Sequence, residues 1–203
     1  MIMCMFKMPL YEKEKIVCVT NRHLAEDFFS QVEKVAAMGI RTIILREKDL
    51  TASEYEKLAR EVLSICMKYQ TDCILHNFYE VAEKLCQKEM SVRPTGLHLP
   101  IQQFLTLTEK QKKRIPLLGV SVHSLSEAGQ CEQLGASYVT VGHIFTTDCK
   151  KDVPPRGLSY LKEICEGINI PVYAIGGIHA ENMDACLAAG AKKICMMSDL
   201  MRI

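Results

Sequence analysis

Apolar residues recur in two different rhythms along this chain from Lys15 onward. Short runs rich in β-branched residues have the length of buried strands. Eight such runs predict strands at Ile16–Thr20, Thr42–Arg46, Cys73–His76, Gly96–Leu99, Leu117–Val122, Tyr138–Ile144, Pro171–Gly177 and Lys193–Ser198. Longer stretches between them repeat apolar residues every three or four positions, as one face of a helix requires. These stretches predict helices at Leu24–Met38, Ser53–Tyr69, Phe78–Cys86, Ser124–Leu134, Leu158–Cys165 and Ala180–Ala189.

Strands that alternate with helices predict a parallel sheet, and eight repeats favour a closed (β/α)8 barrel over an open sheet. The first predicted strand is not followed by a G-x-G-x-x-G turn, which weakens a dinucleotide-binding alternative. We therefore predict a single α/β domain, a TIM barrel, over residues 1–203, with residues 1–14 as an N-terminal extension.

The predicted helix ends carry local signals. Ser53 with Glu56 has the spacing of a capping box. Three glycines are placed to end helices in a left-handed conformation, namely Gly39, Gly135 and Gly190. Only five residues follow Ser198, so we expect a short barrel whose eighth helix is absent or truncated. We expect either the apolar N-terminal segment or a second copy in a homodimer to cover the strand surface left open.

Composition narrows the class of protein. Hydrophobic residues make up 48% and charged residues 24% of the 203 residues, and the net charge is +1. No basic patch or long apolar run suggests nucleic acid or a membrane as a partner. The ten cysteines include no C-x-x-C pair, so we interpret them as free thiols of a cytoplasmic protein and expect no zinc.

Candidate site residues lie at the carboxyl ends of the predicted strands, where barrel enzymes hold their chemistry. All six histidines of the chain fall there, at His23, His76, His98, His123, His143 and His179. Arg46 and Lys48 follow the second strand, where they offer cations to a carboxylate or phosphate. A solvated loop is the alternative interpretation of these two charges.

Phosphate binding is a second expectation. Gly176-Gly177 ends the seventh strand and Met197-Ser198 ends the eighth, and barrels often bind a phosphate through backbone N–H groups of these two loops. Close packing between strand and helix explains a glycine pair equally well. Further oxyanion ligands are expected in the loop after the sixth strand, namely Thr147 and Lys150.

The ordered motifs of the chain resemble the thiamine phosphate synthase superfamily. They are Leu-Arg-Glu-Lys, Gly-Leu-His-Leu, Gly-Val-Ser-Val-His-Ser, Val-Gly-His-Ile-Phe-Thr-Thr-Asp-Cys-Lys-Lys and Ala-Ile-Gly-Gly-Ile, spread over residues 16–203. The resemblance implies that synthases bind a pyrimidine diphosphate through magnesium, using an Asn-Asp pair after the third strand and another Asp after the fourth. Here these positions read His76-Asn77 and Gln103. Amides are poor replacements for the anionic oxygens that magnesium prefers.

The remaining motifs resemble the thiazole tautomerases of the same superfamily, above all Ser-Val-His-Ser-Leu and Gly-His-Ile-Phe-Thr-Thr-Asp-Cys-Lys-Lys. This branch implies that His123 is the acid and base that moves one proton in a carboxylated thiazole ethyl phosphate, with no cofactor. The residues that the resemblance and the loop positions assign to the substrate are Arg46, Lys48, Ser121, Thr147, Lys150, Gly176, Gly177, Met197 and Ser198. Two alternatives stay open: a thiamine phosphate synthase that couples the thiazole phosphate to the pyrimidine diphosphate, and a non-catalytic thiazole-phosphate binder or regulator.

Overall fold

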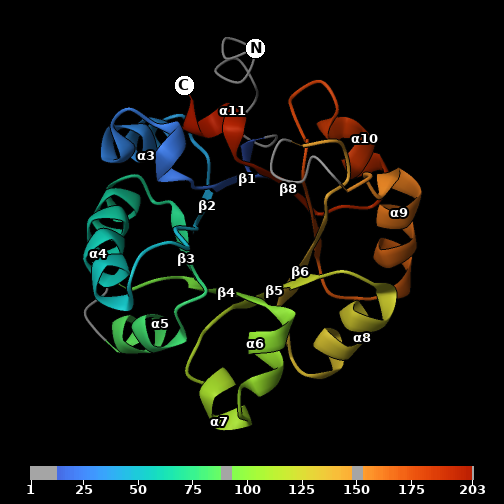
Figure 1. Cartoon of the computed structure of the whole chain (residues 1–203), viewed down its shortest axis with the longest axis horizontal. Helices are drawn as coiled ribbons and strands as arrows, with labels where there is room; N and C mark the ends of the chain where they lie inside the picture. Colours follow the sequence, from blue (N-terminus) through green and yellow to red (C-terminus); the bar gives the residue numbers. More distant parts are fainter. Residues whose placement is uncertain (1–12, 88–92, 148–152, 203) are drawn as a thin grey trace.

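A closed barrel of eight parallel strands forms the centre of the molecule. The computed structural model describes residues 13–87, 93–147 and 153–202. The strands are β1 (Ile16–Val19), β2 (Thr42–Leu45), β3 (Asp72–His76), β4 (Gly96–Pro100), β5 (Leu118–Val122), β6 (Tyr138–Gly142), β7 (Val172–Ile175) and β8 (Lys193–Met196). They pair in chain order, and β8 closes on β1 through Val17 opposite Cys195. The predicted fold class, a (β/α)8 TIM barrel, is confirmed (Figure 1).

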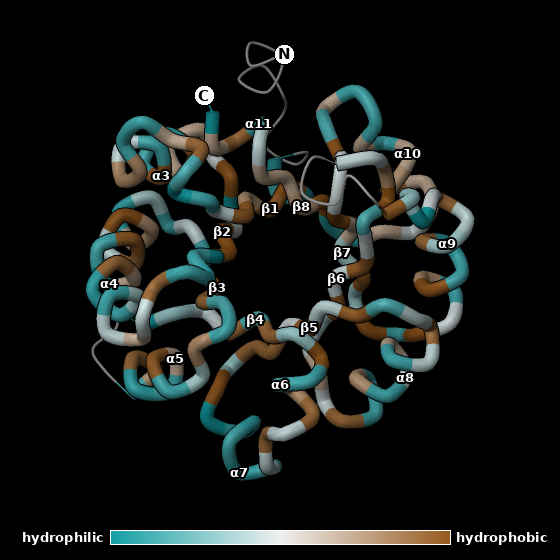
Figure 2. The backbone as a smooth tube through the Cα atoms, in the orientation of Figure 1, coloured by the Kyte–Doolittle hydropathy of each residue, from teal (hydrophilic) through white to brown (hydrophobic). Residues whose placement is uncertain are grey.

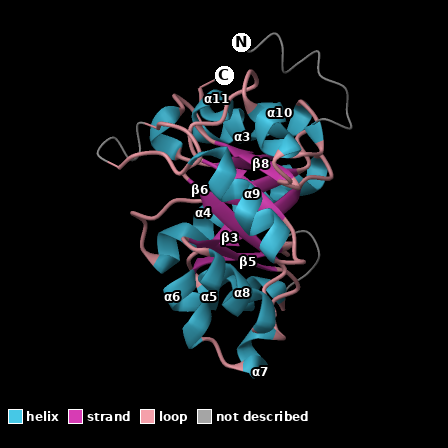
Figure 3. Cartoon of the chain, turned by 90° about the vertical axis from the view of Figure 1, so that its right-hand side faces the viewer, coloured by secondary structure: helices cyan, strands magenta, loops and turns pink. Residues whose placement is uncertain are grey.

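Helices surround the barrel on its outside (Figures 1 and 3). They are α3 (Phe28–Ala37), α4 (Ala52–Lys68), α5 (Tyr79–Cys86), α6 (Ile101–Thr106), α7 (Glu109–Lys112), α8 (Leu125–Gln133), α9 (Gly157–Gly167), α10 (Met183–Ala188) and α11 (Ser198–Met201), with a short 3-10 turn η1 (Arg22–Leu24). Helices α6 and α7 are not among the helices that the sequence predicts. The segment between β4 and β5 forms these two short helices instead of one long amphipathic helix. In the described part of the chain, no helix is long and apolar enough to cross a membrane.

The apolar residues divide between two cores because successive side chains of a strand point to opposite faces. A large core fills the space between strands and helices, and it includes Ile16 and Cys18. A small core inside the barrel contains Val17, Val19, Ile44, Ile74, Tyr138, Tyr173 and Cys195. Figure 2 shows the apolar stripes of the surrounding helices alternating with polar ones. Inward-pointing residues nearer the carboxyl ends of the strands are polar. The interior of the barrel therefore changes from apolar to polar toward the mouth at which these strand ends lie.

Two predicted helix starts are corrected by side-chain capping. The capping box of α4 is Thr51 with Glu54, not Ser53 with Glu56, since Thr51 accepts from the Glu54 amide and Glu54 accepts from the Thr51 amide. The first long helix begins at Phe28 instead of Leu24, because the Asp27 carboxylate accepts two amide hydrogen bonds there. The three predicted C-terminal glycines do take positive φ angles, at Gly39, Gly135 and Gly190.

The end of the chain carries a single four-residue helix after β8. Helix α11 packs against α3 and η1, and Leu200 and Met201 are fully buried there. The side-chain amide of Gln31 in α3 donates to the Leu200 carbonyl at 2.6 Å. The four-residue α11 is the truncated eighth helix that the sequence predicts. Residues 1–12 of the predicted extension lie outside the described residues.

Candidate active site

A cavity of about 990 Å³ opens at the carboxyl ends of the strands. Nine of the ten predicted site residues line it: Arg46, Lys48, Ser121, His123, Thr147, Gly176, Gly177, Met197 and Ser198. The tenth, Lys150, lies outside the described residues. Loops from β2, β5, β6, β7 and β8 thus bring the predicted residues to one place, as the topology of a barrel requires.

Buried Glu47 fixes the loop that carries Arg46 and Lys48. The Thr20 hydroxyl donates to Glu47 at 2.6 Å, and the Arg22 amide donates to the same carboxylate at 3.1 Å. The Arg46 amide donates to the Thr20 hydroxyl at 2.9 Å. Of the four consecutive charges at 46–49, the cations therefore line the cavity, while Glu47 joins the β1 and β2 loops.

Asp49 also joins the β1 and β2 loops. Arg22 donates to it through both terminal nitrogens, at 2.6 and 2.5 Å. These bonds lower the pKa of Asp49. His23 lies 3.1 Å from the same carboxylate on the exposed surface and does not line the cavity. The expectation that all six histidines face one site is wrong for His23, because η1 turns it outward.

A hydrogen-bonded chain runs from the barrel interior to the cavity. Nδ1 of His98 lies 3.0 Å from the Tyr138 hydroxyl, and its Nε2 lies 2.8 Å from the Ser121 hydroxyl. The Thr140 hydroxyl donates to Ser121 at 3.1 Å. Burial and Lys48 lower the pKa of His98 to about 3, so this imidazole is neutral. Ser121, a predicted substrate ligand, is thereby held in a fixed orientation.

His76 stacks on His98, with 5.7 Å between ring centroids. Burial, then His98, then Lys48 and Arg46 lower the pKa of His76 to about 2. Within the described residues no group bonds its Nδ1, and the same holds for Nδ1 of buried His143. Buried polar atoms are rarely left unpaired, so these two imidazoles indicate polar ligand or water contacts in the cavity floor.

His123 lies at the rim, directly after β5. Its backbone is held on both sides: its amide donates to Glu127 at 2.6 Å, and Arg156 donates to its carbonyl at 2.6 Å. The residue is exposed and its side chain lines the cavity. An imidazole on a fixed backbone at the mouth can reach a bound ligand and exchange protons with it.

The glycine pair after β7 lets the backbone pack closely against the loop that follows β6. Gly176 and Gly177 have φ angles of 100° and 66°, and a Cβ on either would come within 2.3 Å of a neighbouring atom, His143 Cβ or the Thr146 carbonyl. No other residue type fits here without strain. Beside this turn, Ser198 begins α11. The two loops face one end of the cavity.

Three charged residues at this end were not among the predicted ligands: His179, Asp199 and Arg202. The sequence places His179 after a strand, but nothing in it pairs this residue with Asp199, twenty residues later. Asp199 belongs to α11 and Arg202 directly follows it. The placement of α11 over the mouth depends on its packing against α3 and η1.

The residues at the expected magnesium positions do not fit a metal–diphosphate site. The side-chain amide of Gln103 donates to the Asn77 side-chain oxygen at 2.7 Å. The pair offers no carboxylate, and one of its two amide oxygens is already used. Among residues 13–87, 93–147 and 153–202, no group of three His, Cys, Asp or Glu side chains could hold a metal ion.

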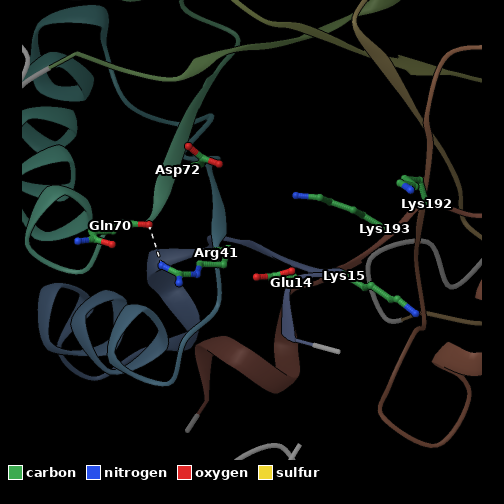
Figure 4. Close-up of a pocket in the computed structure, with 7 residues that line it drawn as sticks. All are labelled: Glu14, Lys15, Arg41, Gln70, Asp72, Lys192 and Lys193. Atoms are coloured by element: carbon green, nitrogen blue, oxygen red, sulfur yellow. Dashed lines mark hydrogen bonds between the residues drawn. The ribbon is translucent and has the colours of Figure 1, made fainter. Parts of the chain in front are cut away.

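A second cavity, of about 600 Å³, lies at the opposite end of the barrel. Figure 4 shows its charged side chains, which are Glu14, Lys15, Arg41, Asp72, Lys192 and Lys193, together with Gln70. They lie at the amino ends of the strands, where residues of a barrel serve stability more often than catalysis. No predicted site residue lies there, so the first cavity is the candidate active site.

Comparison with known proteins points to one family. Residues 16–200 match the family model described as thiamine monophosphate synthase. The chain is 35% identical over 172 residues to the thiamine-phosphate synthase of Halalkalibacterium halodurans, covering 83% of this chain and 78% of that protein. It is 32% identical to thiamine-phosphate synthase 2 of Streptococcus pneumoniae, covering 94% and 89%.

A solved structure agrees with these sequence relatives. The thiamine phosphate pyrophosphorylase from Pyrococcus furiosus superposes with a TM-score of 0.78 at 28% identity, covering 96% of this chain and 91% of that one. FabK from Thermotoga maritima reaches a TM-score of 0.66 at 16% identity, which shows a shared barrel fold alone.

Proposed function

The chain belongs to the thiamine monophosphate synthase family, and from this premise we propose that it is a thiazole tautomerase of thiamine biosynthesis. Its substrate would be a carboxylated dihydrothiazole with an exocyclic alkene and an ethyl phosphate tail. The reaction moves one proton from a ring carbon to the exocyclic carbon, which makes the ring aromatic. Atoms and charge balance without a second reactant.

The observation that carries this choice within the family is the Asn77–Gln103 amide pair. It occupies the positions at which the resemblance implies magnesium carboxylates in the synthases, and its members bond each other at 2.7 Å. Neutral amides supply little of the negative charge that a magnesium–diphosphate complex needs. The end of the cavity that is proposed to bind the thiazole phosphate keeps its glycines. The missing carboxylates therefore affect only the binding of the pyrimidine diphosphate, which a synthase needs and a tautomerase does not.

His123 is the proposed acid and base. An imidazole titrates near ~6.5 and so can take a proton from carbon and return it near neutral pH. Arg46 is the proposed bidentate ligand of the substrate carboxylate, and Lys48, which lines the same cavity, is proposed as a second cation. Ser121, oriented by His98, offers a hydroxyl to the ring. Thr147 and Lys150 are proposed ligands from the β6 loop.

The phosphate is proposed to bind the amides around Gly176, Gly177, Met197 and Ser198, where α11 begins. Binding at this end places the thiazole ring over the middle of the cavity, between Arg46 and His123. The proposed chemistry needs no metal or organic cofactor. We place the protein in the cytoplasm, since its eight described cysteines are free thiols.

The first prediction tests His123. We expect His123→Asn to lower kcat by about 10²–10⁴-fold, while the thiazole phosphate product binds with nearly unchanged Kd. His23→Asn is the matched control, because His23 also follows a strand but lies outside the cavity. Near-normal turnover by His123→Asn would remove this histidine from the mechanism, whereas no turnover by the wild-type protein would leave the binder interpretation.

The names of the relatives favour a second candidate, a thiamine phosphate synthase. The two functions differ in one assay. Purified protein is incubated with thiazole phosphate, the pyrimidine diphosphate and magnesium, and thiamine phosphate is measured; in parallel, aromatisation of the carboxylated dihydrothiazole is followed with a chelator present. We expect only the second reaction, and coupling in the first would establish the synthase.

A further inference from the structure

His179 and Asp199 form a side-chain pair at the phosphate end of the cavity. Nδ1 of His179 lies 2.9 Å from each carboxylate oxygen of Asp199. The Asp199 side chain is 7% exposed, whereas that of His179 is 45% exposed. Both residues line the cavity. The carboxylate is therefore the buried member of the pair, and the imidazole is the exposed one.

The backbone around His179 is fixed to the glycine turn. The side-chain oxygen of Asn182 accepts from the His179 amide at 2.8 Å, and its side-chain nitrogen donates to the Gly177 carbonyl at 3.0 Å. Asn182 thus bridges the turn that would hold the phosphate and the residue that follows it. The bridge fixes the backbone of His179 relative to this turn, and the Asp199 carboxylate holds its imidazole.

The charges make the pair more than a structural contact. A buried carboxylate next to a phosphate site repels a dianionic ligand. Here Nδ1 of His179 is committed to the Asp199 carboxylate. Among the described residues, none hydrogen-bonds Nε2 of His179. This nitrogen is left for a ligand at the cavity end.

We propose that His179 is a side-chain ligand of the substrate phosphate, and that Asp199 is a positioning residue that orients its ring. The inference rests on the proposed function for the identity of the ligand. In the bound state, the imidazolium form of His179 would donate Nδ1–H to the Asp199 carboxylate and Nε2–H to a phosphate oxygen. The charges then alternate as carboxylate, imidazolium and phosphate. Arg202, which lines the same end, adds a second cation.

A double-mutant cycle tests this arrangement by calorimetric titration of thiazole ethyl phosphate. His179→Gln should raise Kd about 10-fold or more, the effect of losing one charged hydrogen bond, and it uncovers the Asp199 carboxylate. Adding Asp199→Asn to His179→Gln should then recover about fivefold in affinity, because the repelling charge is gone. A purely structural pair predicts the opposite, since the second substitution would weaken binding further.

Two controls separate this inference from the proposed function. The same thiazole without its phosphate should bind all variants alike, and His23→Gln, from the exposed His23–Asp49 pair, should leave Kd unchanged. Unchanged Kd in His179→Gln, or equal losses for both thiazoles, would overturn the inference and leave the tautomerase proposal standing. If the wild-type protein binds inorganic phosphate through His179 but no thiazole phosphate, the phosphate ligand stands and the proposed substrate fails.

Discussion

At the scale of single residues, depth along the barrel decides what each histidine can do. His76 and His98 point into the interior, stack on each other and stay neutral because burial lowers their pKa to about 2 and about 3. His123 and His179 line the cavity nearer to solvent. One residue type therefore supplies both neutral rings in the interior and candidate ligand contacts at the mouth.

The buried pair predicts how stability depends on pH. In the unfolded chain both imidazoles titrate near ~6.5, and in the folded protein they stay neutral far below that. The unfolded state therefore binds more protons below pH ~6.5, and stability falls as pH falls from there toward about 3. The expected slope is about 1.4 kcal/mol per pH unit for each imidazole.

Urea titrations at several pH values between 7 and 4 measure this slope. The variant His76→Gln/His98→Gln should start from a lower stability, because the bonds of His98 to Tyr138 and Ser121 are lost, yet lose less of it on acidification. Carboxylates such as Asp49 contribute equally to both proteins. Parallel slopes for the wild type and the double variant would contradict the assignment of neutral histidines.

At the scale of elements, helix starts are set by side chains that satisfy the first free amides. Two sequences near the start of α4 have the spacing of a capping box, Thr51 with Glu54 and Ser53 with Glu56. The structure uses the first, with Thr51 and Glu54 bonded to each other's amides. This choice starts the helix two residues earlier and places Tyr55 in the core, where its hydroxyl donates to the Leu45 carbonyl at 2.6 Å.

The two boxes make a matched pair of variants. Thr51→Ala should lower the free energy of unfolding by about 1 kcal/mol, since an amide loses its cap. Ser53→Ala, at an exposed position inside the first turn, should change it by less than about 0.5 kcal/mol. Circular dichroism during urea unfolding measures both free energies. A larger loss in Ser53→Ala would favour Ser53 with Glu56 as the capping box.

At the scale of the whole molecule, the closure of the barrel joins the site to the end of the chain. Strand β8 pairs with β1, and α11 then packs over the junction against α3. Leu200 is fully buried at this contact. Because Ser198, Asp199 and Arg202 lie on or next to the same short helix, the packing of α11 against α3 holds one wall of the cavity.

Removing that contact should weaken the fold as a whole. Leu200→Ala should cost about 2–5 kcal/mol, the range for truncating a buried leucine. Leu134→Ala, at a position 37% exposed, is the control and should cost far less. The chain has no tryptophan, so circular dichroism is the readout, and equal losses in the two variants would show that α11 contributes little to stability.

The sequence by itself determined the eight strands, the parallel barrel and the placement of nine predicted site residues at one mouth. It could do so because strand and helix periods are local, and because every parallel strand delivers its carboxyl end to the same rim. Only the tertiary structure decided which of those residues meet. His23 turns outward, Asn77 bonds Gln103, and Asp199 bonds His179. Such pairs depend on register, strand tilt and helix packing between segments that no local pattern connects.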